Sequence, residues 1–584
     1  MTFTKLTLSL SLITGLAFTQ LAFAQVDQAR LTGTVSDASG GILPNVTVKI
    51  VNQKTGAARE AVSNASGIYF APGLSASTYS VTATAAGLEP AAYKDINLAV
   101  GQERTLNIAL QAAGVTTSIT ISGGDLAVVE TSSATVGANV NAREVAEMPI
   151  NGRQISQLYL LTPGAQSSGG GSFDNIRFSG QSNQQNAVKF DGVEGSAIVD
   201  ASPGNLNGQT SSAFRLQASL ETVQEFRVES SNYPAEYGTG TGGQISIITK
   251  SGGNELHGSL FEYIRNDAMD ARNYFDGVNK NPLRLNQFGG SVGGAIIKDK
   301  LFFFSHYEGL RQHAGIALVG QTPSAAIRNL PVCGSGVAGR CVDSQIKPLF
   351  GAFPLGNRGA TSNPDFDIAQ LDGRAVVNEN SESVRLDYHQ NDKNTFYVRW
   401  FRDDGTSNAP FDVSGSAFQQ KATTQNGVAS FQRIVSPSIV NEIKFGYNGP
   451  KTRTNGVAPV VPGLDLSATT LNITGANVLV GIGGQGASAG ISIPSGLVRA
   501  SSATNGRAQP YTNYSLSYSD TLSWIKGNHN FKFGGEFRQV RLYTDRLGGV
   551  TYAFGNLDSF LANTPSISVL GDLSAPSPFN NGAT

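Results

Sequence analysis

The sequence predicts a mainly β protein built from successive units, and three observations lead to this prediction. Glycine accounts for 68 of the 584 residues, above the ~7% of an average protein. Charged residues account for only 15%, below the usual ~25%. Short runs of alternating apolar and polar residues recur along the chain between clusters of turn-forming residues. The net charge of −1 argues against a nucleic-acid partner, because such binding depends on Lys and Arg neutralising phosphates.

The first 24 residues predict a secretory signal peptide. Lys5 gives a positive start, residues 8–18 are mostly apolar, and the small-x-small triplet that ends at Ala24 predicts cleavage before Gln25. The alternative is an N-terminal membrane anchor, for which the apolar run is short. No later segment has the ~18–20 consecutive apolar residues of a spanning helix, so any passage through a membrane requires a β-barrel.

The two cysteines of the chain agree with export. Cys333 and Cys341 lie in a glycine-rich stretch and can close a small loop in an oxidising compartment. A structural disulfide is the prediction, and two unpaired thiols are the alternative.

Residues 25–111 predict a small antiparallel β-sandwich. About seven short strand-like runs are separated by turn clusters such as those at 39–41 and 64–67. In four of the runs, apolar or small residues at alternate positions predict one buried face: Leu31, Gly33 and Val35; Val46, Val48 and Ile50; Tyr79, Val81 and Ala83; and Leu106, Ile108 and Leu110.

Residues 126–250 mix helix and strand signals and predict an α/β domain, which follows a linker at 112–125. Asn141 is the predicted N-cap of a short helix that ends at Met148. Asn151 is the predicted cap of a second helix. The apolar face expected for this second helix consists of Ile155, Leu158 and Leu161.

Residues 251–584 have longer alternating strands, which come in pairs joined by tight turns at 298–300, 390–394 and 526–528. Strands of ~9–12 residues, short turns at one end and long polar loops at the other are typical of a transmembrane antiparallel β-barrel. The expected loops include 312–381 and 448–510. Aromatic residues near strand ends fit interfacial girdles, among them Phe302, Phe303, Phe304, Tyr388, Trp400, Phe401, Tyr447 and Trp524. A large soluble β-sandwich or solenoid remains the alternative at this point.

Several segments together resemble a known family. "EMPINGRQISQLYLLTPG", "VQEFRVESSNYPAEYGTGTGGQISIITKSGGNELHGSLFEYIRND" and "LSWIKGNHNFKFGGEFR" resemble TonB-dependent outer-membrane receptors of the Oar-like branch. Residues 25–111 resemble that branch's carboxypeptidase-regulatory-like domain, which has a carbohydrate-binding-like fold. The resemblance implies a plug domain at 126–250, the first part of the barrel at 251–584, and a Gram-negative outer membrane with the N-terminal domain in the periplasm.

The resemblance also implies partners. A receptor of this family contacts outer-membrane lipid, binds a substrate such as a siderophore, saccharide or peptide, and imports it with energy from TonB and its inner-membrane complex. TonB pairs with a short extended segment, for which strand addition needs free backbone groups. The candidate TonB box is Ser118, Ile119, Thr120 and Ile121 in the linker. The alternative is a linker strand packed on the sandwich.

The strand count departs from the family pattern. About nine or ten barrel strands are found, whereas the resemblance implies ~22. The chain also ends in a loop-like stretch without the terminal aromatic residue typical of such barrels. We therefore expect this sequence to be a C-terminally truncated fragment of a receptor.

Other function classes are weaker. None of the five histidines begins a His-x-x-Glu pair, and no phosphate-binding glycine loop occurs. We expect no catalytic residue, no metal and no cofactor, and the sequence does not single out substrate-binding residues. An outer-membrane adhesin or structural barrel without active transport remains the alternative function.

Two glycines separate the expected plug and barrel. The extended segment 244–249 is interpreted as the last plug strand, and Leu256 begins the first barrel strand. Gly252 and Gly253 are the predicted hinge between them. Within the plug, Asp191-Gly192 predicts a hairpin.

Overall fold

The computed structural model describes most of the chain. No helix in the described part is long and apolar enough to cross a membrane. The described residues are 28–112, 120–122, 134–167, 176–196, 214–216, 219–272, 280–361, 363–410, 413–415, 417–457, 460–463, 469–473, 491–493, 498–499, 505–506, 508–544 and 550–570.

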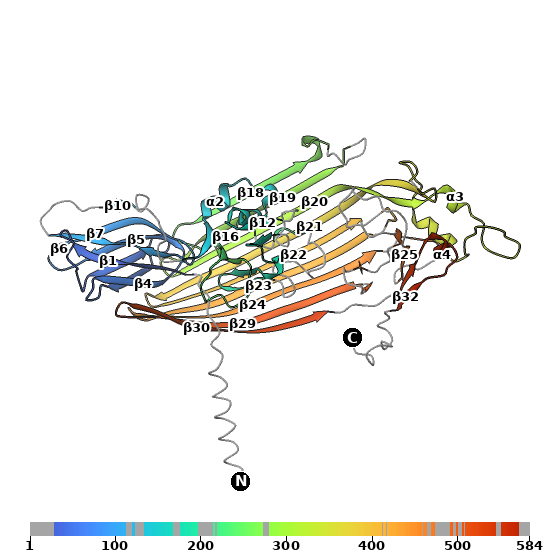
Figure 1. Ribbon diagram of the computed structural model, residues 1–584. Coiled ribbons are helices and arrows are strands. Elements are labelled where there is room, and N and C mark those ends of the chain that lie inside the picture. The colour runs from blue at the N-terminus through green and yellow to red at the C-terminus, as the bar shows by residue number, and fades with distance from the viewer. Residues whose placement is uncertain are drawn as a thin grey trace, which may run out of the picture.

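The N-terminal unit consists of two β-sheets around one apolar core (Figure 1). One sheet has the order β4-β1-β9-β6 with β8 beside β1, and the other has the order β10-β7-β5-β2-β3. Every residue predicted to face this core is buried. The strands are β1 Ala29–Asp37, β2 Thr47–Asn52, β3 Ala58–Val62, β4 Ile68–Leu74, β5 Ser77–Thr84, β6 Leu88–Glu89, β7 Ala91–Leu98, β8 Glu103–Thr105, β9 Ile108–Ala112 and β10 Thr120–Ser122.

Strand β7 was missed from the sequence because its alternation is broken. Tyr93 and Ile96 are both buried although they are three residues apart. Asp95 between them has a φ of 59°, and the pairing of β7 with β5 shifts register at this point. Such a bulge moves the second half of the strand out of phase with the first.

The domain predicted to be the plug, for which we keep that name, is built on a mixed sheet with the order β11-β16-β17-β14-β15. Ile245 and Ile247 of β17 are buried in its core. The sheet strands are β11 Val136–Val140, β14 Ala187–Phe190, β15 Val193–Glu194, β16 Val223–Ser231 and β17 Gln244–Thr249. The smaller elements are α2 Ala142–Glu147, the 3-10 helices η2 Asn151–Arg153, η3 Ile155–Leu161 and η5 Asn183–Gln185, and the paired strands β12 Ala165–Ser167 and β13 Ile176–Phe178.

The first plug helix agrees with the sequence, whereas the second differs. Asn141 caps α2 and forms a capping box with Glu144. The second segment is a 3-10 helix whose N-cap position is Gln154, which makes no side-chain capping hydrogen bond, so the prediction of Asn151 as its cap is wrong. The left-handed backbone of Gly152, with φ 70°, separates Asn151 from this helix. Leu161, at its end, is 52% exposed rather than buried.

The barrel part is one sheet of nine antiparallel strands that follow each other in chain order, within the predicted nine or ten. Among the described residues, the edge strands β18 and β30 do not pair with each other, so the sheet is open. The strands are β18 His257–Asn266, β19 Leu283–Ile297, β20 Leu301–Pro323, β21 Phe366–Asn391, β22 Asn394–Pro410, β23 Ala417–Ser436, β24 Ile439–Val457, β29 Ala508–Lys526 and β30 His529–Thr544. A 3-10 turn, η7 Asp267–Met269, follows β18.

Two expectations about the barrel strands are corrected. The strands reach 26 residues rather than ~9–12, because residues 312–323 and 366–381, expected in a loop, extend β20 and β21 with paired backbones. Residues 448–457 similarly belong to β24. Phe302, Phe304 and Phe401 are buried rather than exposed to lipid, since they lie on the inner face of the sheet, whereas Trp400 on the outer face is 46% exposed.

The loops at one end of the barrel share a separate apolar core, which we call the outer cap. It joins residues 327–366, on the loop between β20 and β21, with Phe554 and Phe560, which follow β30. Its helices are α3 Ala325–Arg328, η8 Lys347–Ala352 and α4 Leu557–Leu561, and its sheet has the order β26-β25-β31-β32. The short strands here are β25 Thr469–Ile473, β26 Ile491–Ile493, β31 Val550–Phe554 and β32 Ile567–Leu570, and a further pair is β27 Val498–Arg499 and β28 Asn505–Gly506.

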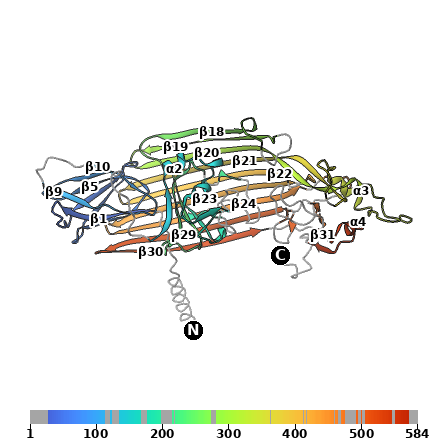
Figure 2. The ribbon, with the colours of Figure 1, turned by 45° about the horizontal axis from the view of Figure 1, so that its top comes forward.

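The sandwich and the outer cap lie at opposite ends of the barrel strands (Figures 1 and 2). The sandwich is at the end with the short turns, and Asn64 bonds the turn between β29 and β30 there. The plug lies between them against the barrel sheet, which it contacts through many polar side chains.

Candidate functional site at the contact of plug and barrel

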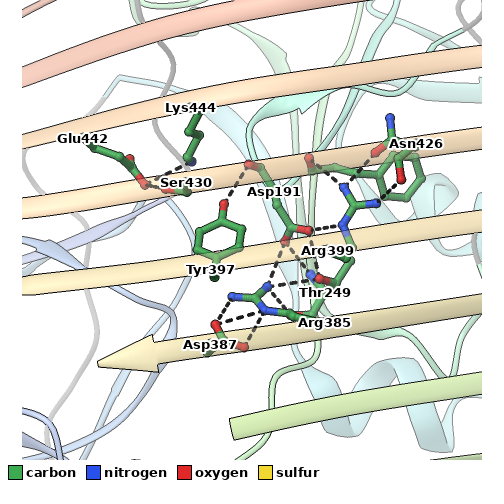
Figure 3. Close-up of polar contacts among 11 residues, drawn as sticks. Asp191, Thr249, Arg385, Asp387, Tyr397, Arg399, Asn426, Ser430, Glu442 and Lys444 are labelled. Atoms are coloured by element: carbon green, nitrogen blue, oxygen red, sulfur yellow. Dashed lines mark hydrogen bonds and ion pairs between the residues drawn. The ribbon is translucent and has the colours of Figure 1, made fainter. Parts of the chain in front are cut away.

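A buried aspartate at the tip of a plug hairpin is the centre of the candidate site (Figure 3). Asp191 and Gly192 connect β14 to β15 and have φ angles of 49° and 82°, as a tight hairpin turn requires. This turn presents the Asp191 carboxylate to the barrel sheet, and the side chain is only 2% exposed.

Two arginines of neighbouring barrel strands reach this carboxylate. Arg399 of β22 donates through Nε to Oδ2 at 2.7 Å. Arg385 of β21 lies 3.4 Å from Oδ1 and also binds Asp387 on its own strand, with Nη2 to Oδ1 at 2.8 Å. Thr249, at the end of the plug strand β17, donates its backbone N–H and its hydroxyl to the same carboxylate, each at 2.9 Å. We call these five residues the Asp191 network.

The Asp191 network keeps a buried carboxylate ionised. Burial acts to raise the pKa of Asp191, but Arg399, Arg385 and the two Thr249 hydrogen bonds outweigh it and hold the pKa below its usual range. A buried ion pair of this kind adds little net stability relative to an apolar contact, yet removing one partner leaves an uncompensated charge. The network therefore fixes the position of the hairpin more than it strengthens the fold.

Further polar contacts hold the same hairpin along the sheet. Lys189 of β14 pairs with Glu536 at 3.2 Å, and Glu194 of β15 pairs with Arg538. Asn426 and Asn448 donate to backbone carbonyl oxygens of the hairpin at 2.8 and 2.7 Å. Polar groups of this kind can exchange their partners for water, so breaking the contact would not leave them unpaired.

The plug also meets the barrel through its own backbone. Glu379 of β21 accepts hydrogen bonds from the backbone N–H groups of Arg215 and Leu216, at 2.9 and 2.7 Å. Ser219 donates to Glu308 of β20 and lies 3.0 Å from His306. These contacts are buried and polar.

The sandwich contacts both the plug and its connection to the barrel. Lys54, in the turn between β2 and β3, donates through Nζ to the Ser251 carbonyl at 2.7 Å, and its own carbonyl accepts from Asn254 N–H at 3.0 Å. The Val100 N–H donates to the buried Glu225 carboxylate of plug strand β16. The sandwich is therefore bonded to the segment that joins plug and barrel.

Two protein-family models match this chain and assign it to a family. The outer membrane β-barrel domain model matches residues 248–574, and the carboxypeptidase regulatory-like domain model matches residues 30–111. The chain belongs to the outer membrane β-barrel family. This chain is thus a β-barrel protein of the outer membrane.

Three individual proteins are also similar to this chain. The TonB-dependent transporter Oar of Myxococcus xanthus is 28% identical over 313 residues, which are 50% of this chain and 27% of that protein. The chain therefore spans about a quarter of the length of this curated relative. The Escherichia coli outer membrane transporter YddB matches with 11% identity and a TM-score of 0.46, over 72% of this chain and 50% of that one. FpvA of P. aeruginosa, in a complex with iron and a pyoverdine, matches with 13% identity and a TM-score of 0.38, over 72% and 54%.

The TonB-box candidate of this barrel protein lies partly on the sandwich. Ser118 and Ile119 are outside the described residues, whereas Thr120 and Ile121 belong to β10, whose backbone pairs in parallel with β7. The interpretation as a TonB box stays a prediction.

The two predicted hinge glycines lie in a crowded place rather than in an open turn. Both are buried, and neither has a positive φ. A Cβ on Gly252 would lie 2.4 Å from the Phe303 carbonyl oxygen, and a Cβ on Gly253 would lie 2.7 Å from Lys54 Cγ. Glycine is required here because neighbouring atoms approach the backbone closely, not because the chain needs a left-handed conformation.

The remaining predicted residues are placed as follows. Cys333 and Cys341 form a disulfide in the outer cap, with their Cα atoms 5.0 Å apart. The predicted cleavage site at Ala24 and Gln25 lies outside the described residues, as do most residues of 166–183 and 196–215, the plug loops in which we expect substrate to bind.

Sequence reasoning found the Asp191 hairpin but missed its partners. Arg385 and Arg399 are charged residues inside strands of a predicted barrel, where outward positions meet lipid. A charge on the lipid face is costly and therefore rare, so both arginines could have been expected to point into the barrel. That expectation was the available signal for a contact with the plug.

Proposed function

We propose that this chain is the N-terminal part of a TonB-dependent importer, which binds a substrate at the cell surface and releases it to the periplasm when TonB displaces the plug. The observation that carries the proposal is the Asp191 network. It holds a folded domain against the inner face of a barrel sheet by buried polar contacts. These contacts fix the position of the domain, yet their polar groups can bind water instead once the domain moves away.

The plug must be displaced by force applied from the periplasm, and the linker provides the attachment. Ser118 to Ile121 lie between the sandwich and the plug, on the periplasmic side in this proposal. An extended segment there can pair with a strand of TonB through backbone hydrogen bonds. The substrate class, whether siderophore, saccharide or peptide, remains a prediction of the family resemblance.

Site-specific cross-linking tests the role of the linker. In the receptor as its bacterium encodes it, Ile119→Cys should form a disulfide with a cysteine placed in the box-binding region of TonB. The two native cysteines bond each other, so the introduced thiol is free to react. Lys94→Cys, on the exposed side of β7, is the matched control and should not cross-link.

Proline substitution separates import from the alternative function. Ile119→Pro with Ile121→Pro removes two backbone donors and should abolish cross-linking and substrate uptake while surface abundance stays unchanged. An adhesin or structural barrel would show neither the cross-link nor any effect of the prolines, and that result would overturn the proposal.

A further inference from the structure

A row of buried oxygen atoms crosses three barrel strands at positions a few residues along the same strands from Arg385 and Arg399 of the Asp191 network. Ser381 of β21 and Thr424 of β23 lie directly opposite Asp403 of β22, one on each side. All three side chains are at most 5% exposed. Among the described residues, the Ser381 and Thr424 hydroxyls have no hydrogen-bond partner, and the Asp403 carboxyl has no partner except the carboxyl group of Glu379.

The opposite positions bring these side chains close together. Residues that face each other on antiparallel strands have Cβ atoms ~4.5–5.5 Å apart, and all three lie on the inner face of the sheet. Buried carboxylates and hydroxyls are unfavourable when they lack partners, so a row of them indicates a bound group that supplies the missing contacts.

A second carboxylate lies beside the first. Glu379, two residues before Ser381, is fully buried, and its carboxyl group contacts that of Asp403. Glu379 also accepts the backbone hydrogen bonds of Arg215 and Leu216, as described above, and the Arg215 side chain lies near enough to act on its charge. Glu308 adds a further negative charge nearby, although its oxygens are bonded to Ser219 and Gln287.

We propose that Asp403, Glu379 and Ser381 bind a hard divalent cation, Ca²⁺, and that Thr424, on the strand beyond Asp403, bonds a water molecule of its coordination shell. Every available ligand atom is an oxygen, which selects hard cations over transition metals. Ca²⁺ tolerates irregular coordination that water completes, whereas Mg²⁺ demands near-octahedral geometry that a row across three strands does not offer. The cation neutralises two adjacent carboxylates that would otherwise repel each other.

The bound cation would also help to hold the plug in its position against the barrel. Glu379 serves both the cation and the plug backbone, so the bound cation keeps this carboxylate charged and oriented toward Arg215 and Leu216. The apolar contacts of Phe214 and Leu216 with Leu310 and Val377 then remain packed beside it. The inference does not depend on whether the protein imports a substrate.

Calcium titration of the purified, chelator-treated receptor tests the site. CaCl2 should raise the thermal unfolding midpoint by several degrees, and calorimetry should detect the binding. Asp403→Asn should weaken the affinity at least tenfold, and Thr424→Val or Ser381→Ala should weaken it a few-fold. Asp404→Asn is the matched control, because Asp404 lies on the next position of β22, faces the other way and already bonds Arg402 and Thr423.

The other outcomes overturn the proposal. No response of the wild-type protein to CaCl2 would do so, as would an equal response of Asp403→Asn, or a response to MgCl2 or NaCl alone. If Asp403→Asn is more stable than the wild type and calcium has no effect, the two carboxyl groups share a proton instead. Should Asp403→Asn fail to fold, Thr424→Val and Ser381→Ala still decide the question.

Discussion

The plug is held on two sides by contacts of different chemistry. Toward the barrel, Asp191 is bound by two arginines whose side chains are themselves anchored on the strands. Toward the sandwich, it is held through Glu225, which accepts one backbone hydrogen bond from Val100, and Lys54 of the sandwich bonds the segment that follows the plug. The first contact is a network of compensated charges, and the second places single ionisable groups against backbone atoms.

This difference separates a barrel contact that does not respond to pH near neutrality from a sandwich contact that does, which we call the adjustable contact. The depressed pKa of Asp191 keeps the barrel contact ionised, and its stabilisation would be lost only as the pH falls through that low value. On the sandwich side, burial raises the pKa of Glu225 to about 7, and burial together with Arg385 lowers the pKa of Lys54 to about 8. The sandwich contact can therefore respond to conditions near neutrality that leave the barrel contact unchanged.

The largest effect is expected from breaking the Asp191 network. Asp191→Ala leaves two buried arginines without their shared partner, which costs about 3–5 kcal/mol. The plug should become sensitive to protease in the folded receptor, and the protein should conduct ions in planar bilayers. Asp404→Asn, which removes a carboxylate on the outer face of the same sheet, should leave both properties at the wild-type level. A sealed, protease-resistant Asp191→Ala protein would contradict the role given to the network.

The sequence predicted the architecture of the protein better than it predicted the Asp191 network. Alternation predicted the buried faces of the sandwich because one side of each strand meets one core, and it failed at β7 where Asp95 forms a bulge. Strand ends were misplaced because polar extensions such as 366–381 still pair their backbones. The partners of Asp191 lie about 200 residues away, and only the register of β21 and β22 brings Arg385 and Arg399 together. A single sequence gives the periodicity of a strand but not which residues face each other.

Substitutions at two neighbouring glycines compare the barrel contact and the sandwich contact directly. A Cβ at Gly252 meets backbone oxygens of Phe303 and Gly294 in the barrel, which cannot move aside, so Gly252→Ala should cost about 1–3 kcal/mol. A Cβ at Gly253 meets mainly the flexible Lys54 side chain, so Gly253→Ala should cost less and should loosen the sandwich rather than the plug. Limited proteolysis that follows sandwich and plug separately distinguishes the two effects. Equal release of both domains in both variants would refute this division, and valine at either position should enlarge the same effects.

The smallest expected effect is a dependence on pH of the contact between plug and sandwich. Because the pKa of Glu225 is higher in the docked state than its ordinary 4.5, docking takes up a proton. The contribution of Glu225 to docking is therefore largest below pH 4.5, falls as the pH rises to about 7, and is constant above that value. Between pH 5 and pH 7 the change amounts to about 2 kcal/mol and should appear as faster hydrogen exchange at Val100 at pH 7 than at pH 5, after correction for the intrinsic exchange rate.

Glu225→Gln decides whether this carboxyl group is responsible. The amide keeps an acceptor for the Val100 N–H and cannot titrate, so the variant should keep the docked sandwich at both pH values and lose the pH dependence. Asp191 remains ionised throughout this range, so the plug should stay seated in the barrel in both proteins. If plug and sandwich loosen together as the pH rises, the two contacts form one unit, and the distinction between a pH-independent barrel contact and an adjustable sandwich contact fails.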